Sequence, residues 1–220
     1  TPTSGEVRFL GENLKNKTVA QISKDVILVF QHPEHMIFEE TVYDELVFCA
    51  EAQGIEYKEE DALQVLKDFG LYEDRQEFPV NLSMGIKHIL TVLSVLFSSA
   101  QVIIFDEPTL GMDAKLRMRL EEIIERLRAM GKTIIMISHE TPFVFKQSDE
   151  ILLLNKGKNV FYGPKEAFIE NFNMLEEYNI TVPPVIKLCR KFGLAPDIVT
   201  PDAFAEAFFA QYGVQAGGTQ

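Results

Sequence analysis

Three short apolar runs stand out in the hydrophobic pattern of this 220-residue chain. Residues 26–30 read Val-Ile-Leu-Val-Phe, residues 102–105 read Val-Ile-Ile-Phe, and residues 133–137 read Thr-Ile-Ile-Met-Ile. Each run is too short for a helix, rich in β-branched side chains and free of polar alternation, which is typical of buried strands in a parallel sheet. The pattern therefore predicts an α/β fold with a parallel sheet at its core.

Apolar residues at helical spacing fill the stretches between these runs. Helices are expected over about 41–54 and 59–69, and a third from near Ser83. Because these helices interrupt the strand pattern, they are predicted to form a helical subdomain over about 41–99. An amphipathic helix over 114–130 follows the second strand.

The last quarter of the chain has a different pattern. Residues 149–155 and 159–162 are predicted to pair as a hairpin around Lys156-Gly157-Lys158, because a glycine-containing turn separates two apolar stretches. A mainly helical tail follows, and Val214 to Gln220 are expected to be disordered. The predicted division is a main domain over 1–163 and a helical C-terminal extension over 164–220. The tail helices are expected over about 165–177, 183–192 and 202–211.

Composition narrows the class of protein. A hydrophobic content of 46% allows one sizeable core, and no apolar run approaches the roughly 18 residues of a membrane span, so we expect a soluble, cytosolic protein. A net charge of −12 argues against nucleic-acid binding through phosphate neutralisation. Cys49 and Cys189 lie far apart without metal-ligand spacing, so buried thiols are expected.

Two adjacent carboxylates end the central run. Asp106 and Glu107 directly follow Phe105, and ligands collect at the carboxyl ends of strands in parallel sheets. One acid can orient a magnesium ion through its water shell while the other takes a proton from an attacking water. The pair alone is also compatible with a strand that ends in a solvated, helix-capping turn.

Polar residues mark three further points. Gln31 follows the first run, and a strand-terminal amide can hydrogen-bond a metal-bound water. Ser83 is placed to cap a helix whose first turn offers N–H groups to a phosphate. His139 follows the third run, where a histidine can donate to a terminal phosphate. By themselves these residues are equally compatible with ordinary loop and cap positions.

Taken together, this ordered set resembles the ATPase domains of ATP-binding-cassette (ABC) proteins. In that family the second nucleotide motif is four apolar residues and Asp-Glu, followed after a short turn by an aspartate, and Asp106, Glu107 and Asp113 match these positions. The resemblance implies a P-loop NTPase-type parallel sheet with a helical insertion. The residues after Gln31 are similar to those of energy-coupling-factor importers of cobalt, nickel and vitamins. That similarity rests on Gln31, Pro33, Phe38, Thr41, Val42, Glu45 and Phe48.

The resemblance implies a role for each matched residue, with ATP and Mg²⁺ as cofactors. Glu107 would be the base, Asp106 and Gln31 would hold magnesium partly through water, and His139 would hold the γ-phosphate. Ser83 and Gly85 would contact ATP bound by a partner ATPase, identical or different. Dimer closure would then move a membrane transport subunit through the loop after Gln31, which places the protein on the inner face of the cell membrane.

Two motifs depart from the family pattern. The signature Leu-Ser-Gly-Gly-Gln keeps Leu82, Ser83 and Gly85 but has Met84 and Ile86 instead of glycine and glutamine. Met84 is expected to crowd the nucleotide, and Ile86 cannot supply an amide hydrogen bond. The phosphate-binding Gly-x-x-x-x-Gly-Lys-Ser/Thr is absent from the 220 residues. We expect an amino-terminal truncation and an inactive fragment, with a natural pseudo-ATPase as the alternative.

Several alternatives remain open at this point. A non-hydrolysing, scaffolding ABC subunit is favoured by Met84 and Ile86, whereas a soluble ABC protein acting on ribosomes or DNA is opposed by the acidic charge. His32 and His35 are more readily explained as loop side chains than as a metal pair. The aromatic stripe of the last helix either contacts a second ATPase subunit or packs on its own domain. That stripe is Phe204, Phe208 and Phe209.

Overall fold

The computed structural model describes residues 2–195 and 198–213. It divides into two compact units, Thr1–Ser138 (unit 1) and His139–Gln220 (unit 2). The sequence-based division at residue 163 stays a prediction, and the expected disorder of Val214 to Gln220 lies outside the described residues. In the described part of the chain, no helix combines the length and apolar character needed to cross a membrane.

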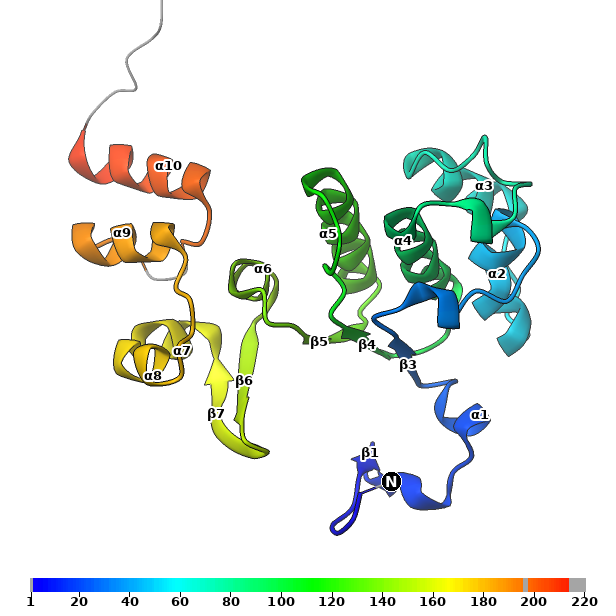
Figure 1. Ribbon diagram of the computed structural model, residues 1–220, viewed down its shortest axis with the longest axis horizontal. Coiled ribbons are helices and arrows are strands. Elements are labelled where there is room, and N and C mark those ends of the chain that lie inside the picture. Colours follow the sequence, from blue (N-terminus) through cyan, green and yellow to red (C-terminus); the bar gives the residue numbers. More distant parts are fainter. Residues whose placement is uncertain (1, 196–197, 214–220) are drawn as a thin grey trace, which may run out of the picture. The chain divides into compact units, whose positions relative to one another are not determined.

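The core of unit 1 is a three-stranded parallel sheet in the order β3-β4-β5 (Figure 1). The strands are β3 (Val26–Val29), β4 (Val102–Asp106) and β5 (Thr133–Ile137). They confirm the three strands and the α/β fold that the apolar runs predict.

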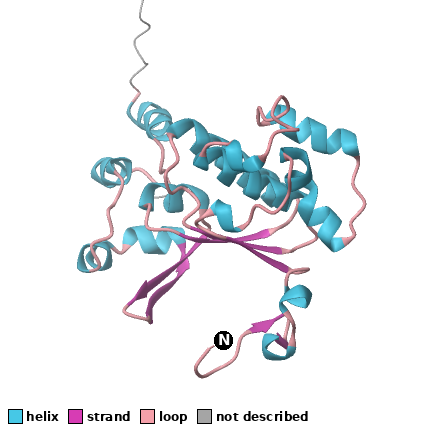
Figure 2. Ribbon diagram, turned by 45° about the vertical axis from the view of Figure 1, so that its right-hand side comes forward, coloured by secondary structure: helices cyan, strands magenta, loops and turns pink. Residues whose placement is uncertain are grey.

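The two faces of this sheet differ in burial. Ile103 and Phe105 are fully buried on the face that the helices of unit 1 cover (Figure 2). On the opposite face, Leu28, Ile135 and Ile137 are 38%, 47% and 53% exposed. The expectation that the third run is a buried strand is therefore wrong, because Thr133, Ile135 and Ile137 are exposed and the residues between them are only half-buried.

Capping side chains set the starts of the helices. Thr41 Oγ1 accepts the N–H of Asp44 at 3.0 Å and begins α2 (Val42–Gln53). Asp113 Oδ1 accepts the N–H of Leu116 at 2.8 Å and begins α5 (Ala114–Ala129). A Thr or Asp cap satisfies N–H groups that the first helical turn leaves without intrahelical partners.

Near the N-terminus, Arg8–Phe9 and Glu12–Asn13 pair as a small antiparallel hairpin. The remaining helices and strands of unit 1 are β1 (Arg8–Phe9), β2 (Glu12–Asn13), α1 (Val19–Ile22), α3 (Glu59–Asp68) and α4 (Met84–Ser94). Its 3₁₀ turns are η1 (Leu14–Asn16), η2 (Pro33–His35), η3 (Pro79–Asn81) and η4 (Val95–Phe97).

Unit 2 confirms the expected hairpin and a mainly helical tail. Its first tail helix is broken at Asn171, where one continuous helix was expected, because Asn171 leaves the helical conformation and caps the next helix through Met174 N. Phe204 and Phe208 pack with Phe192 inside this unit, with ring centroids 6.2 and 5.0 Å away. The elements are α6 (Thr141–Gln147), β6 (Glu150–Asn155), β7 (Lys158–Pro164), α7 (Lys165–Glu170), α8 (Phe172–Glu177), α9 (Pro184–Phe192) and α10 (Pro201–Tyr212).

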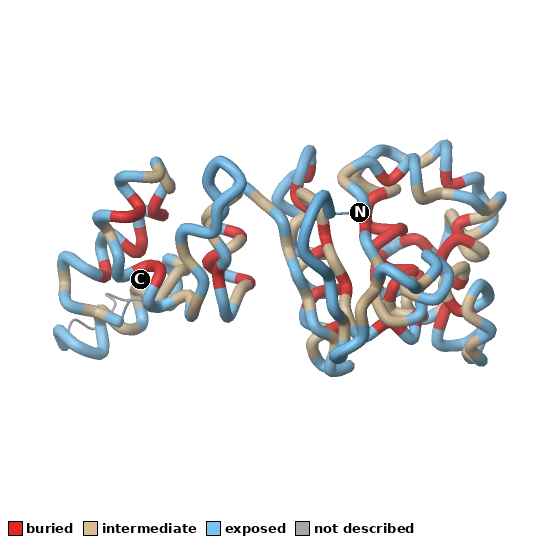
Figure 3. The backbone as a smooth tube through the Cα atoms, turned by 90° about the horizontal axis from the view of Figure 1, so that it is seen from below, coloured by how far each residue is buried: buried red, intermediate tan, exposed pale blue. Residues whose placement is uncertain are grey.

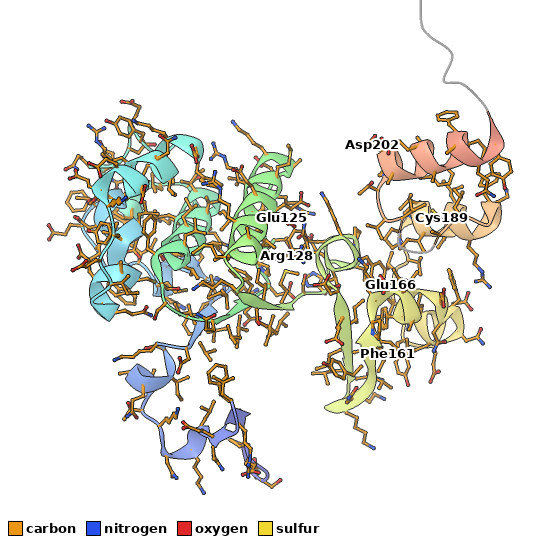
Figure 4. All side chains as sticks on the ribbon, turned by 180° about the vertical axis from the view of Figure 1, so that it is seen from behind. Glu125, Arg128, Phe161, Glu166, Cys189 and Asp202 are labelled. Atoms are coloured by element: carbon orange, nitrogen blue, oxygen red, sulfur yellow. The ribbon has the colours of Figure 1, made fainter. Side chains whose placement is uncertain are left out.

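Each unit has its own buried cluster, drawn in red in Figure 3. In unit 1 every residue of α4 from His88 to Ser94 is buried, so this helix is central to the core. In unit 2 the core includes Phe145, Phe168 and Cys189, the last labelled on α9 in Figure 4. Cys49 and Cys189 form no disulfide; Cys189 is buried as expected, whereas Cys49 is only half-buried.

His88 makes the core of unit 1 sensitive to acid. Its side chain is 3% exposed, its Nε2 atom has no hydrogen-bond partner, and burial lowers its pKa from 6.5 to about 4. Between pH 6.5 and about pH 4, the His88 imidazole is protonated in the unfolded chain but neutral in the folded chain. The free energy of unfolding must therefore fall as the pH drops from about 6.5 to about 4.

We predict that His88→Leu removes this dependence. The stability of the variant relative to the wild type should rise by about 2 to 3 kcal/mol between pH 7.5 and pH 4.5. Urea unfolding at a series of pH values measures the difference. His35→Ala, at an exposed loop histidine, is the control, and a parallel pH dependence in wild type and His88→Leu would contradict the prediction.

Candidate active site

Three of the expected site residues share one edge of the sheet. Asp106 ends β4 opposite Ile137, and Gln31 lies two residues beyond the end of β3. Because Val29 pairs with Phe105 in a parallel register, Gln31 and Glu107 follow the paired strands at the same carboxyl edge. The edge therefore brings together Gln31, Asp106 and Glu107.

The backbone holds Glu107 in an unusual conformation. Its φ is 48°, a left-handed value that side-chain-bearing residues seldom adopt. Its N–H donates to the carbonyl oxygen of Ile137 at 2.8 Å, and the following Pro108 and Thr109 are buried. Strained backbone of this kind persists only where the surroundings fix it, so β5 and the buried turn together set the direction of the glutamate.

The donor set at the edge fits a magnesium ion. Gln31 supplies an amide oxygen and Asp106 a carboxylate, the oxygen ligands that Mg²⁺ prefers. Neither side chain makes a hydrogen bond or ion pair with another residue in the described ranges. No cluster of three His, Cys, Asp or Glu side chains suited to a metal occurs among the described residues.

A second set of expected residues surrounds a hollow of about 360 Å³ in unit 1. Ser83 occupies the cap position of α4 as expected, but its side chain makes no capping hydrogen bond. Asp113 lies on the same hollow, at the start of α5. The hollow is lined by Gly70, Leu71, Asp74, Leu82, Ser83, Ile86, Asp113, Lys115, Leu116 and Arg119.

Sequence reasoning missed three charged residues of this hollow, Asp74, Lys115 and Arg119. Lys115 and Arg119 are four residues apart on α5, so they share one face of the helix. This spacing on a predicted amphipathic helix could have indicated a basic pair on one face. Asp74, from the turn after α3, carried no signal of its own.

The two substituted signature positions have different environments. Met84 is 49% exposed, so its side chain faces outward at the first position of α4. Ile86 is half-buried and lines the hollow. Gly85 has a packing role, because a Cβ at that position would overlap Leu116 Cδ1 on α5. A side chain at this position would therefore require the end of the half-buried Leu116 side chain to move.

His139 is the first residue of unit 2 and lies two residues beyond the end of β5. It precedes α6, which has Pro142 in its first turn. The expected strand and polar turn therefore follow one another, and the short helix α6 after them was not among the expected helices.

Comparison with known proteins decides the family. The family model described as ABC transporter matches residues 1–110, half of the chain. A putative ABC transporter ATP-binding protein of Pyrococcus furiosus is 36% identical over 197 residues, which cover 89% of this chain and 75% of the relative. The chain belongs to the ABC transporter family.

Other relatives of this ABC protein carry more specific names. An energy-coupling factor transporter ATP-binding protein of Acetivibrio thermocellus is 34% identical over 195 residues, covering 86% of this chain and 69% of the relative. Its counterpart in Thermotoga maritima is 33% identical over 180 residues, covering 78% and 65%. Among solved structures, an ATP-binding subunit of an ABC transporter aligns with a TM-score of 0.69 at 21% identity, covering 81% of this chain and 76% of that one. CbiO1 of Clostridium perfringens aligns with a TM-score of 0.62 at 24% identity, covering 86% and 77%; both structures support the fold.

We predict that Gly85→Ala destabilises the ABC core through its contact with Leu116. Overpacking costs about 1 to 3 kcal/mol, and the better helix propensity of alanine offsets up to about 1 kcal/mol. In a Leu116→Ala background the same substitution should cost nothing or stabilise. Chemical unfolding of the two single variants and the double variant measures the coupling, and additive effects would contradict the packing role.

Proposed function

We propose that the protein is the ATP-hydrolysing subunit of an importer of the energy-coupling-factor kind. The observation that carries this proposal is the convergence of Gln31, Asp106 and Glu107 at one carboxyl edge of the sheet. The names of the Acetivibrio and Thermotoga relatives favour that importer class. Metal ions or vitamins are the proposed cargo.

Each edge residue has a chemical role in the proposal. Glu107 takes the proton of the attacking water, and Gln31 and Asp106 hold Mg²⁺, partly through water. Bound Mg²⁺ supplies positive charge against the phosphates of ATP. His139 donates to the γ-phosphate and holds the reacting groups in line.

The hollow beside α4 belongs to a second part of the proposal. Ser83, Gly85 and Asp113 face ATP held by a partner ATPase subunit, identical or different, and closure of the pair drives a membrane subunit. This assembly places the protein on the inner face of the cell membrane. The net charge of −12 supports a protein partner over nucleic acid.

ATP binding in this family also requires a phosphate-binding loop. The 220 residues contain no Gly-x-x-x-x-Gly-Lys-Ser/Thr loop, whose N–H groups and lysine hold the phosphates. We therefore predict that this stretch by itself binds ATP more weakly than about 1 mM. Isothermal titration calorimetry with Mg-ATP measures the affinity, and a dissociation constant in the micromolar range would contradict the prediction.

The proposed reaction is tested on the protein joined to an upstream phosphate-loop segment. We predict Mg²⁺-dependent ATP hydrolysis that falls by about 100-fold or more in Glu107→Gln, because the amide cannot accept the proton of water. Glu125→Gln is the control, since Glu125 is a surface residue of α5 paired with Arg128 at 2.8 Å (Figure 4). Hydrolysis establishes the proposed activity and shows that Met84 and Ile86 are tolerated, whereas no hydrolysis by the wild type would favour a non-hydrolysing subunit.

A further inference from the structure

Glu45 is a buried carboxylate outside the proposed catalytic set. It lies in the first turn of α2 and is only 1% exposed. Its Oε2 atom accepts the N–H of Phe38 at 2.9 Å and the N–H of Glu39 at 3.0 Å. Burial raises its pKa above the ordinary glutamate value, and the two N–H bonds oppose that rise without cancelling it. Burial of a carboxylate costs free energy unless hydrogen bonds compensate for it. Here the compensating hydrogen bonds come from the backbone of residues 38 and 39.

That backbone is the loop which carries Gln31. The loop leaves β3 after Val29, which is buried, and reaches α2 at Val42. Its first half forms the turn η2, closed by the N–H of Met36 on the Pro33 carbonyl. For residues 37–40, the two bonds to Glu45 are the only hydrogen bonds in the described part of the chain. Glu45 is therefore the anchor of the second half of the loop.

A second tether of the loop is weaker. Lys87 Nζ on α4 lies 3.8 Å from Glu34 Oε1, and the Glu34 side chain is 56% exposed. The Lys87 side chain is 12% exposed, but the distance is long and solvent reaches the Glu34 carboxylate, so the pair contributes little. Hydrogen bonds from two N–H groups to a buried charged oxygen are stronger, because water does not compete for them.

The anchor also sets the direction of Phe38. Phe38 is 65% exposed, and the centroid of its ring lies 5.3 Å from the centroid of the Phe48 ring on α2. An aromatic ring held against a helix on only one side gains little from burial. The conformation of this segment therefore depends on the Glu45 carboxylate more than on packing of its apolar side chain.

We propose that Glu45 is a positioning residue that fixes the loop of residues 31–40 and thereby the reach of the Gln31 amide. The inference rests on the proposed function, in which Gln31 helps to hold Mg²⁺. A loop fixed at both ends samples fewer conformations than one that is free at its second half. Loss of the anchor therefore weakens the hold on Mg²⁺ while Glu107 and the sheet edge remain intact.

The test compares Glu45→Ala, Glu45→Gln and Glu40→Ala in the protein joined to an upstream phosphate-loop segment. Glu40 is an exposed acid of the same loop and is the matched control. In Glu45→Ala the amides of Phe38 and Glu39 should exchange hydrogen at least about tenfold faster, while the rest of α2 keeps its protection. The Mg²⁺ concentration for half-maximal ATP hydrolysis should rise several-fold, with kcat at saturating Mg²⁺ unchanged. Glu45→Gln keeps an acceptor oxygen and should restore both values.

Other outcomes overturn the inference. Unchanged hydrogen exchange at Phe38 and Glu39 in Glu45→Ala would show that Glu45 does not anchor the loop. Faster exchange along the whole of α2, or a fall in kcat without a change in the Mg²⁺ requirement, would make Glu45 a structural residue only. Failure of the wild type to hydrolyse ATP would overturn the proposed function and the Mg²⁺ effect, whereas exchange would still decide whether Glu45 anchors the loop.

Discussion

The parallel pairing of β4 with strands on both sides is the constraint on which the site depends. It aligns the ends of β3 and β4, so the polar residues that follow them share one edge. It also brings the Ile137 carbonyl within 2.8 Å of the Glu107 N–H, and that bond holds the glutamate in its left-handed conformation. The geometry of the acid pair is thus a property of three strands, and a turn alone would not maintain it.

The elements with local signals were predictable from the sequence. The apolar runs indicated β3, β4 and β5, and Thr41 marked the start of α2, because a cap acts within four residues. Errors arose where distant residues, or a competing local signal, decided the outcome. The exposure of Ile135 is set by which face the helices cover, and the break at Asn171 by a local cap that competes with helix continuation.

The residues of the candidate site also divide into those that the sequence could predict and those that it could not. Positions at strand ends were predictable, because topology alone places them. The two tethers of the Gln31 loop were not, since a glutamate in a first helical turn usually serves the helix dipole, and nothing in the pattern indicates that Glu45 turns inward. Gly85 is a similar case. The sequence linked it only to nucleotide contact, whereas in the fold a methyl group at this position would overlap the end of the Leu116 side chain on α5.

The sheet of unit 1 also has an unfinished side. Among the described strands, β5 pairs with β4 alone, so the N–H and C=O groups of its outer edge make no ladder there. The exposed side chains of Ile135 and Ile137 lie along the same strand. An unpaired apolar edge is a template for β-strand addition, by the same polypeptide or by a neighbouring one. Unit 1 taken by itself would consequently be prone to edge-to-edge pairing, and a strand added along β5 would bond the N–H and C=O groups of that edge.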